Sequence, residues 1–275
     1  MLRNSLHAIL ALLLIILNAR CTISPDHHEE LIRPAPQNGD LLQYMKETSR
    51  GIGEITLNAR IKLTGVTRRI PAIKASIKWK RMADRPTGTA RITGTMMFGI
   101  TLFDAIIFPD DLFLYIPSAD TVYCAHKETR WCGMNTEETA RMISLAINPW
   151  LSAVTGTITP CDEESAPLPE DALHVPSQTV CVSFDMDGKT GRAYFHKKRL
   201  VPLAIAFPGT IISYDASMED HSTILPEVIT IKSTRYDIKA EIDIISARNG
   251  TTSNAFDTSP FTSYPCAILS GCITE

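Results

Sequence analysis

The stretch from Ile52 to Ala125 constrains the fold most, because its apolar residues recur at every second position. Between Ile55 and Leu63 the odd positions are apolar and the even positions are polar. A period of two places alternate side chains on opposite faces of an extended strand. The same alternation returns over Ile73–Trp79, after a short basic connection. The two segments therefore predict an antiparallel hairpin with one apolar face.

The segments that follow are apolar on both faces. They are Met96–Phe103, Ala105–Phe108, Leu112–Ile116 and Val122–Tyr123, with turns expected at Pro109–Asp111 and Pro117–Asp120. Strands of this kind bury both of their faces, so other elements must cover the sheet.

A helix is predicted after these strands. Asn135 and Glu138 have the spacing of a capping box, in which each residue satisfies a backbone group of the other. The apolar residues that follow share one helical face, and they are Ala140, Ile143, Ile147, Trp150, Leu151 and Val154. Pro149 must kink or restart this helix. We expect the apolar stripe to lie across the open face of the sheet, as plain core or as part of a cavity wall. Residues 39–50 predict a second, short amphipathic helix before the first strand.

Strand patterns resume in the second half of the chain. The expected strands are Thr179–Phe184, Arg192–Phe195, Leu200–Phe207, Ile211–Ala216, and a hairpin of Pro226–Thr234 against Ile238–Ser246. In total, about ten or eleven strands and one or two helices predict an α+β domain, mainly β, built on a single antiparallel sheet.

The N-terminus has the features of an export signal. Arg3 supplies positive charge, residues 8–17 form an apolar run, and Cys21 follows at the distance where such signals are cut. The run is shorter than the roughly 20 residues that a spanning helix needs. Residues 1–20 are therefore interpreted as a signal peptide. The segment before Cys21 is similar to a bacterial lipoprotein box, although Arg20 stands where a small residue is usual.

Two fates of Cys21 follow from this signal. Lipidation of Cys21 would anchor the protein, since more than one acyl chain gives stable membrane attachment. Cleavage after Ala19 would instead leave Cys21 as a thiol. Lipidation is the favoured interpretation. Residues 21–38, rich in proline, histidine and acidic residues, are then a tether between membrane and domain.

Six cysteines remain after Cys21, and an exported chain meets an oxidising compartment. They are Cys124, Cys132, Cys161, Cys181, Cys266 and Cys272. Three disulfides are therefore expected. Nearest-neighbour pairing would join Cys124 to Cys132, Cys161 to Cys181 and Cys266 to Cys272, but the sequence leaves the other connectivities open. The spacings do not suit a zinc site.

Composition and motifs argue against several functions. The chain of 275 residues has a formal charge of -3 and lacks the basic, aromatic-interleaved stretches of nucleic-acid binders. It contains no G-x-S-x-G or H-E-x-x-H motif, and the adjacent Asp110 and Asp111 lie in an expected turn. We therefore expect no enzymatic activity, no metal, no cofactor and no nucleic-acid partner.

The ordered features resemble a known family. They are the export signal ending at Cys21, the amphipathic hairpin, the strands through Tyr123, the capped helix near Trp150, and the late strand Leu225–Ile231. Together they resemble the lipoprotein-localisation superfamily (LolA/LolB-like), and most closely the membrane-anchored LolB-like outer-membrane lipoproteins. The resemblance covers Leu41–Pro260. It implies a single curved antiparallel sheet that forms an incompletely closed β-barrel, with helices covering an apolar cavity for acyl chains.

The same resemblance implies how the chain is organised and what it does. Residues 39–260 would form the half-barrel domain and residues 261–275 a C-terminal tail. The protein would be a lipoprotein facing the periplasm from the outer membrane, with lipid acyl chains or lipoproteins as partners. The alternative is a structural or interaction lipoprotein of the envelope, with another envelope protein as its partner. LolB-like members also carry an exposed apolar residue on a hairpin loop, a position that Met82 would take here.

Strand parity suggests which residues would line the cavity. The candidates are Ile77, Trp79, Met97, Phe103, Phe108, Phe113, Tyr115 and Trp150. For any single one of them, an ordinary core position is the favoured interpretation. The two interpretations differ in whether space is left between the sheet and the helix that covers it.

Overall fold

The computed structural model describes most of the chain after residue 40. The described residues are 41–65, 71–83, 85, 87–96, 99–130, 134–150, 159–161, 179–186, 189–197, 200–215, 225–233, 238–251 and 254–268. The predicted signal peptide and the tether with Cys21 lie outside them. Met97, Cys132, Cys272 and the end of the predicted helix stripe (Leu151 and Val154) lie outside them as well.

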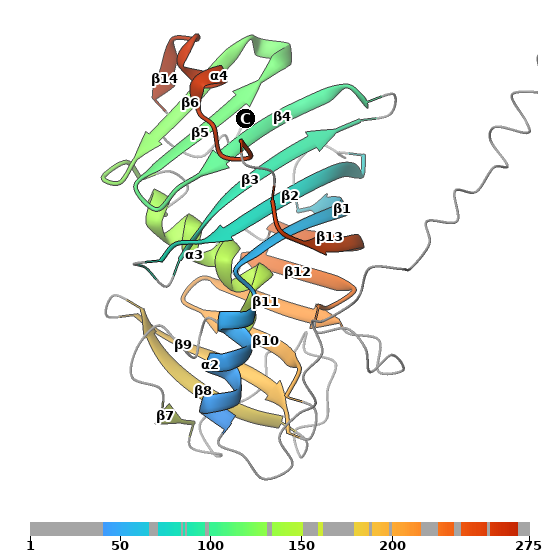
Figure 1. Ribbon diagram of the computed structural model, residues 1–275, viewed down its shortest axis with the longest axis vertical. Helices are drawn as coiled ribbons and strands as arrows, with labels where there is room; N and C mark the ends of the chain where they lie inside the picture. Colours follow the sequence, from blue (N-terminus) through green and yellow to red (C-terminus); the bar gives the residue numbers. More distant parts are fainter. Residues whose placement is uncertain are drawn as a thin grey trace, which may run out of the picture.

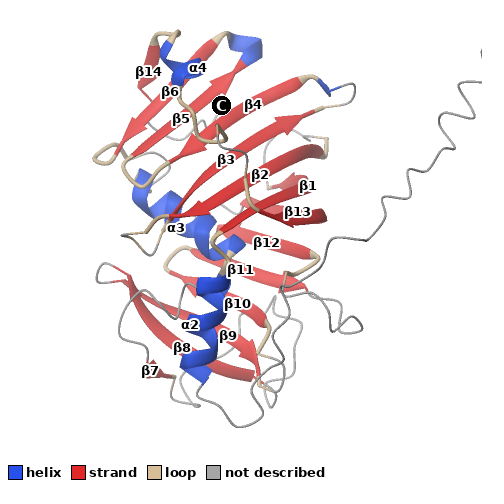
Figure 2. Ribbon diagram, in the orientation of Figure 1, coloured by secondary structure: helices blue, strands red, loops and turns tan. Residues whose placement is uncertain are grey.

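These residues form one large curved sheet that does not close (Figure 1, Figure 2). Its strands are β1 (Glu54–Thr64), β2 (Ile73–Arg81), β3 (Gly88–Thr95), β4 (Thr101–Ile107), β5 (Asp111–Ile116), β6 (Thr121–His126), β7 (Thr159–Pro160), β8 (Thr179–Met186), β9 (Lys189–His196), β10 (Pro202–Phe207), β11 (Thr210–Asp215), β12 (Val228–Ser233), β13 (Ile238–Asn249) and β14 (Cys266–Ile268). Their order is β14-β6-β5-β4-β3-β2-β1-β13-β12-β11-β10-β9-β8-β7. All pairs are antiparallel except β14 with β6. The predicted fold class, a mainly β, incompletely closed barrel with helices, is confirmed.

Three α-helices accompany the sheet in the described part of the chain: α2 (Leu41–Gly51), α3 (Thr136–Ile147) and the single-turn α4 (Ser259–Thr262). A short 3-10 turn, Pro117–Ala119, joins β5 to β6. α2 and α3 correspond to the two predicted helices. None of the described helices combines the length and apolar character needed to cross a bilayer.

The capping box at the start of α3 is confirmed. Asn135 Oδ1 accepts a hydrogen bond from the Glu138 backbone N–H at 2.8 Å, and the Asn135 N–H donates to Glu138 Oε2 at 3.2 Å. The helix ends at Ile147, with Asn148 as its C-cap. It therefore stops before Pro149, because proline disfavours a helical conformation at the residue before it. Pro149 and Trp150 then lie in a 3-10 turn, which agrees with the predicted restart at Pro149 and not with a kink.

The main difference from the sequence prediction is β3, which was not expected. With two glycines and few apolar residues, it lacks the sequence pattern of a strand. Packing explains why both positions are glycine. A Cβ on Gly88 would lie 2.3 Å from Trp79 Nε1, and one on Gly94 would lie 2.3 Å from the Phe103 ring. Flat aromatic rings from the neighbouring strands therefore replace side chains on β3. As a result, Met96–Ile100, predicted as part of a strand, lies in the connection between β3 and β4. The sheet therefore has more strands than the ten or eleven predicted, and the other two additional strands are the short β7 and β14.

The register assigns each side chain to one of two faces. Ile55, Leu57 and Ala59 of β1 pair with Trp79, Ile77 and Ala75 of β2, so these residues share a face that α2 and α3 cover. We call this the inner face and the opposite one the outer face. The inner face holds the main hydrophobic core, which extends from β3 through β13 to Phe184 of β8 and includes Met45 of α2 and Leu145 of α3.

The C-terminal segment builds a second core on the outer face. We call residues 254–268 the C-terminal strap. Figure 1 shows it leaving β13 near the middle of the sheet and reaching the sheet's edge as α4 and β14. Phe261 of α4 packs with Ile106, Val122 and Cys124. The domain therefore continues past Pro260, the predicted boundary, at least to Ile268.

Two disulfides are present in the described residues. Cys161 pairs with Cys181, as nearest-neighbour pairing predicts. Cys124 pairs with Cys266, 142 residues away, and not with Cys132. The nearest-neighbour expectation is therefore wrong for both Cys124 and Cys266, because the strap folds back onto β6 and brings the two residues together.

Candidate functional site

The inner face is almost purely apolar. We considered the described strand residues whose position in the pairing places them on the inner face. Among these, only Arg81 and Lys189 are charged, and both lie at the ends of their strands. Each of these is tied to a helix: Arg81 Nη1 donates to the Ser49 carbonyl of α2 at 3.4 Å, and Lys189 Nζ pairs with Glu138 of α3. No cluster of His, Cys, Asp or Glu able to hold a metal occurs among the described residues. The surface is therefore suited to hydrocarbon.

Burial changes along the inner face. We call the end of the central strands where Thr64, Thr95 and Ser233 lie the hairpin end, since β1–β2, β3–β4 and β12–β13 turn there. Toward the opposite end, Ile55 and Leu57 of β1 are fully buried. Toward the hairpin end several inner-face side chains are partly exposed, while Ile73 of β2 is buried. The partly exposed ones include Ile61, Leu63, Phe103, Ile231, Ala240 and Ile242. Apolar surface is thus accessible at the hairpin end and covered at the other.

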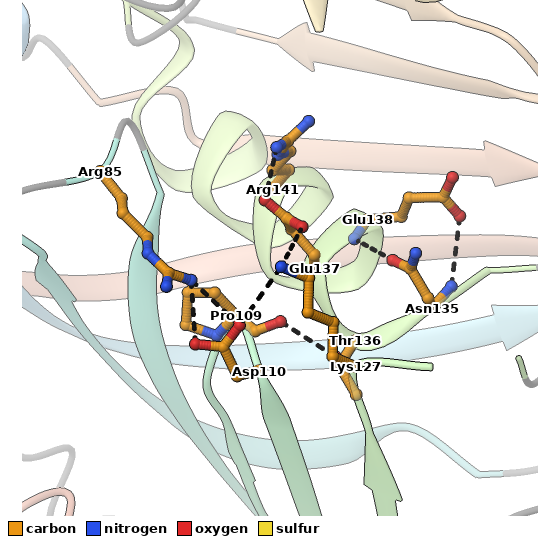
Figure 3. A network of polar contacts seen from close by, with 9 residues as sticks. All are labelled: Arg85, Pro109, Asp110, Lys127, Asn135, Thr136, Glu137, Glu138 and Arg141. Atoms are coloured by element: carbon orange, nitrogen blue, oxygen red, sulfur yellow. Dashed lines mark hydrogen bonds and ion pairs between the residues drawn. The ribbon is translucent and has the colours of Figure 1, made fainter. Parts of the chain in front are cut away.

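A network of polar contacts fixes the start of α3 on the sheet (Figure 3). Thr136 Oγ1 donates to the Pro109 carbonyl at 2.9 Å. Glu137 pairs with Arg141 at 2.5 Å and lies 3.9 Å from Lys127 Nζ. Asp110 lies 3.0 Å from Arg85 Nη1, so the network continues into the loop between β2 and β3.

The contacts of this first turn connect distant strands. Pro109 follows β4 and Lys127 follows β6, whereas Lys189, the partner of Glu138, begins β9. The first and last strands of the sheet are not hydrogen-bonded to each other. Side chains of α3 instead connect strands near one edge of the sheet, β4 and β6, with β9 near the other edge. The first turn of α3 therefore contacts strands from both halves of the sheet.

The middle of α3 is anchored through a buried hydroxyl. Trp79 Nε1 and the Gly88 backbone N–H both donate to Ser144 Oγ, at 3.1 and 2.9 Å. Ser144 Oγ in turn donates to the Ala140 carbonyl at 2.7 Å. The hydroxyl therefore joins β2, β3 and α3 at the buried end of the inner face.

The end of α3 is anchored by Tyr214 of β11. Its hydroxyl donates to the Leu145 carbonyl at 2.7 Å. Burial raises the pKa of the Tyr214 phenol well above its ordinary value of 10.0. The neutral phenol is therefore favoured in the folded state, and its contribution to stability is complete below pH 10 and is lost as the pH rises above it.

We predict that Tyr214→Phe destabilises the protein by about 1–2 kcal/mol at pH 7, because the Leu145 carbonyl loses its buried donor. The variant should also lose less stability than the parent between pH 9 and pH 11, on the order of 1 kcal/mol less, since it has no phenol to ionise. Urea unfolding across this pH range measures both effects. A loss of stability with pH that is the same in both proteins would contradict the assignment.

The structure distributes the predicted lining residues over both faces. Ile77, Trp79 and Trp150 are buried in the inner-face core. Phe103 has inner-face parity, opposite Gly94, and is partly exposed. Met97 lies outside the described residues.

The prediction is corrected for Phe108, Phe113 and Tyr115. Phe113 pairs with Ile106 and Cys124, and all three residues belong to the outer-face core under the strap, together with Phe108 and Tyr115. These three aromatic residues therefore cannot line the inner face. The sequence could not assign the faces because β4 and β5 are apolar on both. By contrast, Ile61, Ile231 and Ile242 were not predicted as lining residues. Their alternation with polar neighbours nevertheless indicated that they share the apolar face of their strands.

The exposed apolar residues lie on a different loop from the one predicted. Met82, in the loop after β2, is partly buried. Met96 is 40% and Ile100 62% exposed, and both lie in the connection between β3 and β4. Ile238, at the start of β13, is also exposed. The hairpin end of the inner face therefore carries apolar residues that point to solvent.

Solved structures with a similar fold come from bacteria. A putative outer membrane lipoprotein-sorting protein domain from Vibrio parahaemolyticus is similar with a TM-score of 0.53 and 12% identity, over 80% of this chain and 96% of that one. A DUF1329 family protein from Desulfovibrio piger has a TM-score of 0.48 and 10% identity, over 80% and 96%. A LolA superfamily protein from Nitrosomonas europaea has a TM-score of 0.46 and 12% identity, over 81% and 100%.

No family model and no curated protein matches the sequence. At 12% identity the similarity to the Vibrio domain concerns the fold. The fold that the resemblance to the LolA/LolB-like superfamily predicted, a curved sheet that does not close and is covered by helices, is therefore confirmed as a fold.

Proposed function

We propose that the protein binds the acyl chains of lipids or lipoproteins on its inner face and acts in the bacterial cell envelope. The observation that carries the proposal is the apolar inner face, which is partly exposed at the hairpin end. Among the described strand residues on this face, Lys189 is the one charged residue at that end. Burial of hydrocarbon contributes about 25 cal/mol per square ångström. A chain of methylenes laid on this surface would therefore bind without any specific polar contact.

The envelope location and the anchor are part of the same proposal. The similar Vibrio structure is described as an outer membrane lipoprotein-sorting domain, which favours a place in the envelope. Lipidation of Cys21 would hold the domain at the outer membrane, facing the periplasm. Mass spectrometry of the mature N-terminus tests this step. An unmodified cysteine, or a chain that starts at Arg20, would remove the anchor.

A structural or interaction lipoprotein is the second candidate, and one observation favours it. Beneath α2 and α3 the inner face is fully buried, with Trp79 and Trp150 at its centre. If the partly exposed region were too small for an acyl chain, the domain would be a filled scaffold. Neither candidate requires catalysis.

Binding of a fluorescent fatty-acid probe separates the two candidates. A Cys21→Ser variant, exported without lipid, provides the full remaining chain in solution. The acyl-binding proposal predicts saturable uptake of the probe and its displacement by unlabelled long-chain lipid. A scaffold predicts only weak uptake that does not saturate.

We further propose that the β3–β4 connection contacts lipid during transfer, since its exposed Met96 and Ile100 can enter a bilayer surface. We expect Ile100→Asp to reduce transfer of bound acyl probe to vesicles by roughly 10-fold, because a charge at the surface opposes insertion. A stopped-flow transfer assay measures the rate. Ile268→Asp, at an apolar residue on β14 that is 74% exposed, is the control and should transfer normally. Equal loss in both variants would contradict a specific role for this loop.

A further inference from the structure

The C-terminal strap covers an apolar region of the outer face. Phe261 is buried against Ile106, Val122 and Cys124. The ring of Tyr264 lies 5.0 Å from that of Tyr115, and the two hydroxyls are 3.4 Å apart. Without the strap, this part of β4, β5 and β6 would expose a contiguous patch of apolar side chains to solvent.

The strap is held at three places by different interactions. At its start, Arg91 Nη1 donates to the Ala255 carbonyl at 3.1 Å, while the same guanidinium pairs with Asp104. In its middle, Phe261 fills the outer-face core. At its end, the three residues of β14 pair with the edge of β6. The Tyr115–Tyr264 pair and the Arg91 guanidinium, 5.9 Å from the centroid of the Phe261 ring, add to these contacts. All of them involve one segment near the edge of the sheet, so the strap can open locally while the central strands stay paired.

The Cys124–Cys266 disulfide closes the far end of the strap. Cys124 belongs to β6 and is 5% exposed beneath the strap, whereas Cys266 is exposed to solvent. The bond joins residues 142 apart in sequence. Cys161–Cys181 spans only 20 residues and connects neighbouring strands β7 and β8. Of these two disulfides between described residues, Cys124–Cys266 is therefore the one that holds a separate segment over an apolar surface.

We propose that Cys124–Cys266 is a redox-sensitive disulfide, and that its reduction controls whether the C-terminal strap covers the outer face. In the oxidised protein the strap is closed. In the reduced protein it leaves the sheet and uncovers both the apolar patch and the edge of β6.

The chemistry requires a dithiol as reductant. Its thiolate attacks the exposed Sγ of Cys266 and forms a mixed disulfide, while the Cys124 sulfur leaves as a thiolate and takes up a proton. The second thiol of the reductant then releases Cys266 as a thiol. Two electrons pass to the protein, and the reductant becomes a disulfide. Attack at Cys266 is favoured because Cys124 is buried.

Pulse alkylation of the reduced full-length protein tests the proposal, with dithiothreitol as the dithiol and N-ethylmaleimide as the label. If the strap opens, Cys124 should be labelled at a rate within about 3-fold of that of Cys266. If the strap stays closed, Cys124 stays buried and its labelling should be on the order of 100-fold slower. The slow result would overturn the proposal, as would isolation of a protein that lacks this disulfide.

Two controls separate local opening from unfolding. The Cys161→Ser/Cys181→Ser variant, left oxidised, should keep the strap closed, so that hydrogen exchange at Phe261 and Tyr264 is unchanged. In the reduced parent these amides should exchange on the order of 100-fold faster, while amides in β1 and β13 stay protected. Loss of protection in β1 and β13 together with the strap would show global unfolding and would contradict the proposal. The Cys124→Ser/Cys266→Ser variant should reproduce the reduced state without reductant.

Discussion

Trp79→Ala should lower the free energy of unfolding by about 4 kcal/mol, the largest single effect on stability that we expect. The side chain is completely buried at the centre of the inner-face core. Its removal leaves a cavity between α3 and the inner face of β2 and β3, and it also removes one of the two donors to Ser144 Oγ. Gly88, whose missing side chain makes room for the indole, would then face empty space.

Denaturant unfolding of the variant measures this effect, and Trp79→Phe provides the matched comparison. Phenylalanine keeps most of the apolar volume but cannot donate to Ser144, so it should cost roughly 2 kcal/mol. Ala and Phe variants of equal stability would indicate that the hydrogen bond dominates. A loss below about 1 kcal/mol for Trp79→Ala would contradict the role of Trp79 as the anchor of α3.

Ile242→Asp should weaken binding of an acyl probe by at least roughly 10-fold, because a carboxylate on the inner face must lose water when hydrocarbon covers it. Ile242 lies between Ile61 of β1 and Ile229 of β12 and is partly exposed toward the hairpin end. The residue is thus placed where a bound chain would run. Titration of the probe against the purified variant measures the change.

The control for this variant lies on the same strand. Ile245 is 54% exposed, at the irregularity in the pairing of β1 with β13. Ile245→Asp introduces the same charge three residues away and should leave binding within about 2-fold of the parent. Thermal unfolding of both variants shows whether the fold is retained. Equal affinity of the two variants would mean that the inner face does not bind the probe.

The sequence predicted the strands in which large apolar residues alternate with polar ones, and it missed β3, whose inner-face positions include two glycines. Alternation in β1 and β2 and the capping box of α3 gave these elements correctly, because water and core impose different residues on the two faces. β3 was missed because Gly88 and Gly94 receive aromatic rings from neighbouring strands. Such packing depends on β2 and β4 and leaves no local signal.

The same limit explains the errors in the candidate site. Phe113 and Tyr115 belong to a second core, which exists only because the strap folds back from the end of the chain. The pairing of Cys124 with Cys266 has the same origin. Contacts between residues far apart in sequence have no periodic pattern, so neither the pairing nor the second core could be predicted from spacing.

Methyl resonances of the isoleucines test the central claim most directly. If acyl chains lie on the inner face, adding a long-chain lipid to the isotopically labelled protein should shift the signals of Ile61, Ile231 and Ile242. The signal of Ile245, which is exposed away from the proposed binding region, should stay in place. Shifts confined to Ile245 and Ile268, or no saturable shift at Ile61, Ile231 and Ile242, would contradict the account and leave an anchored scaffold.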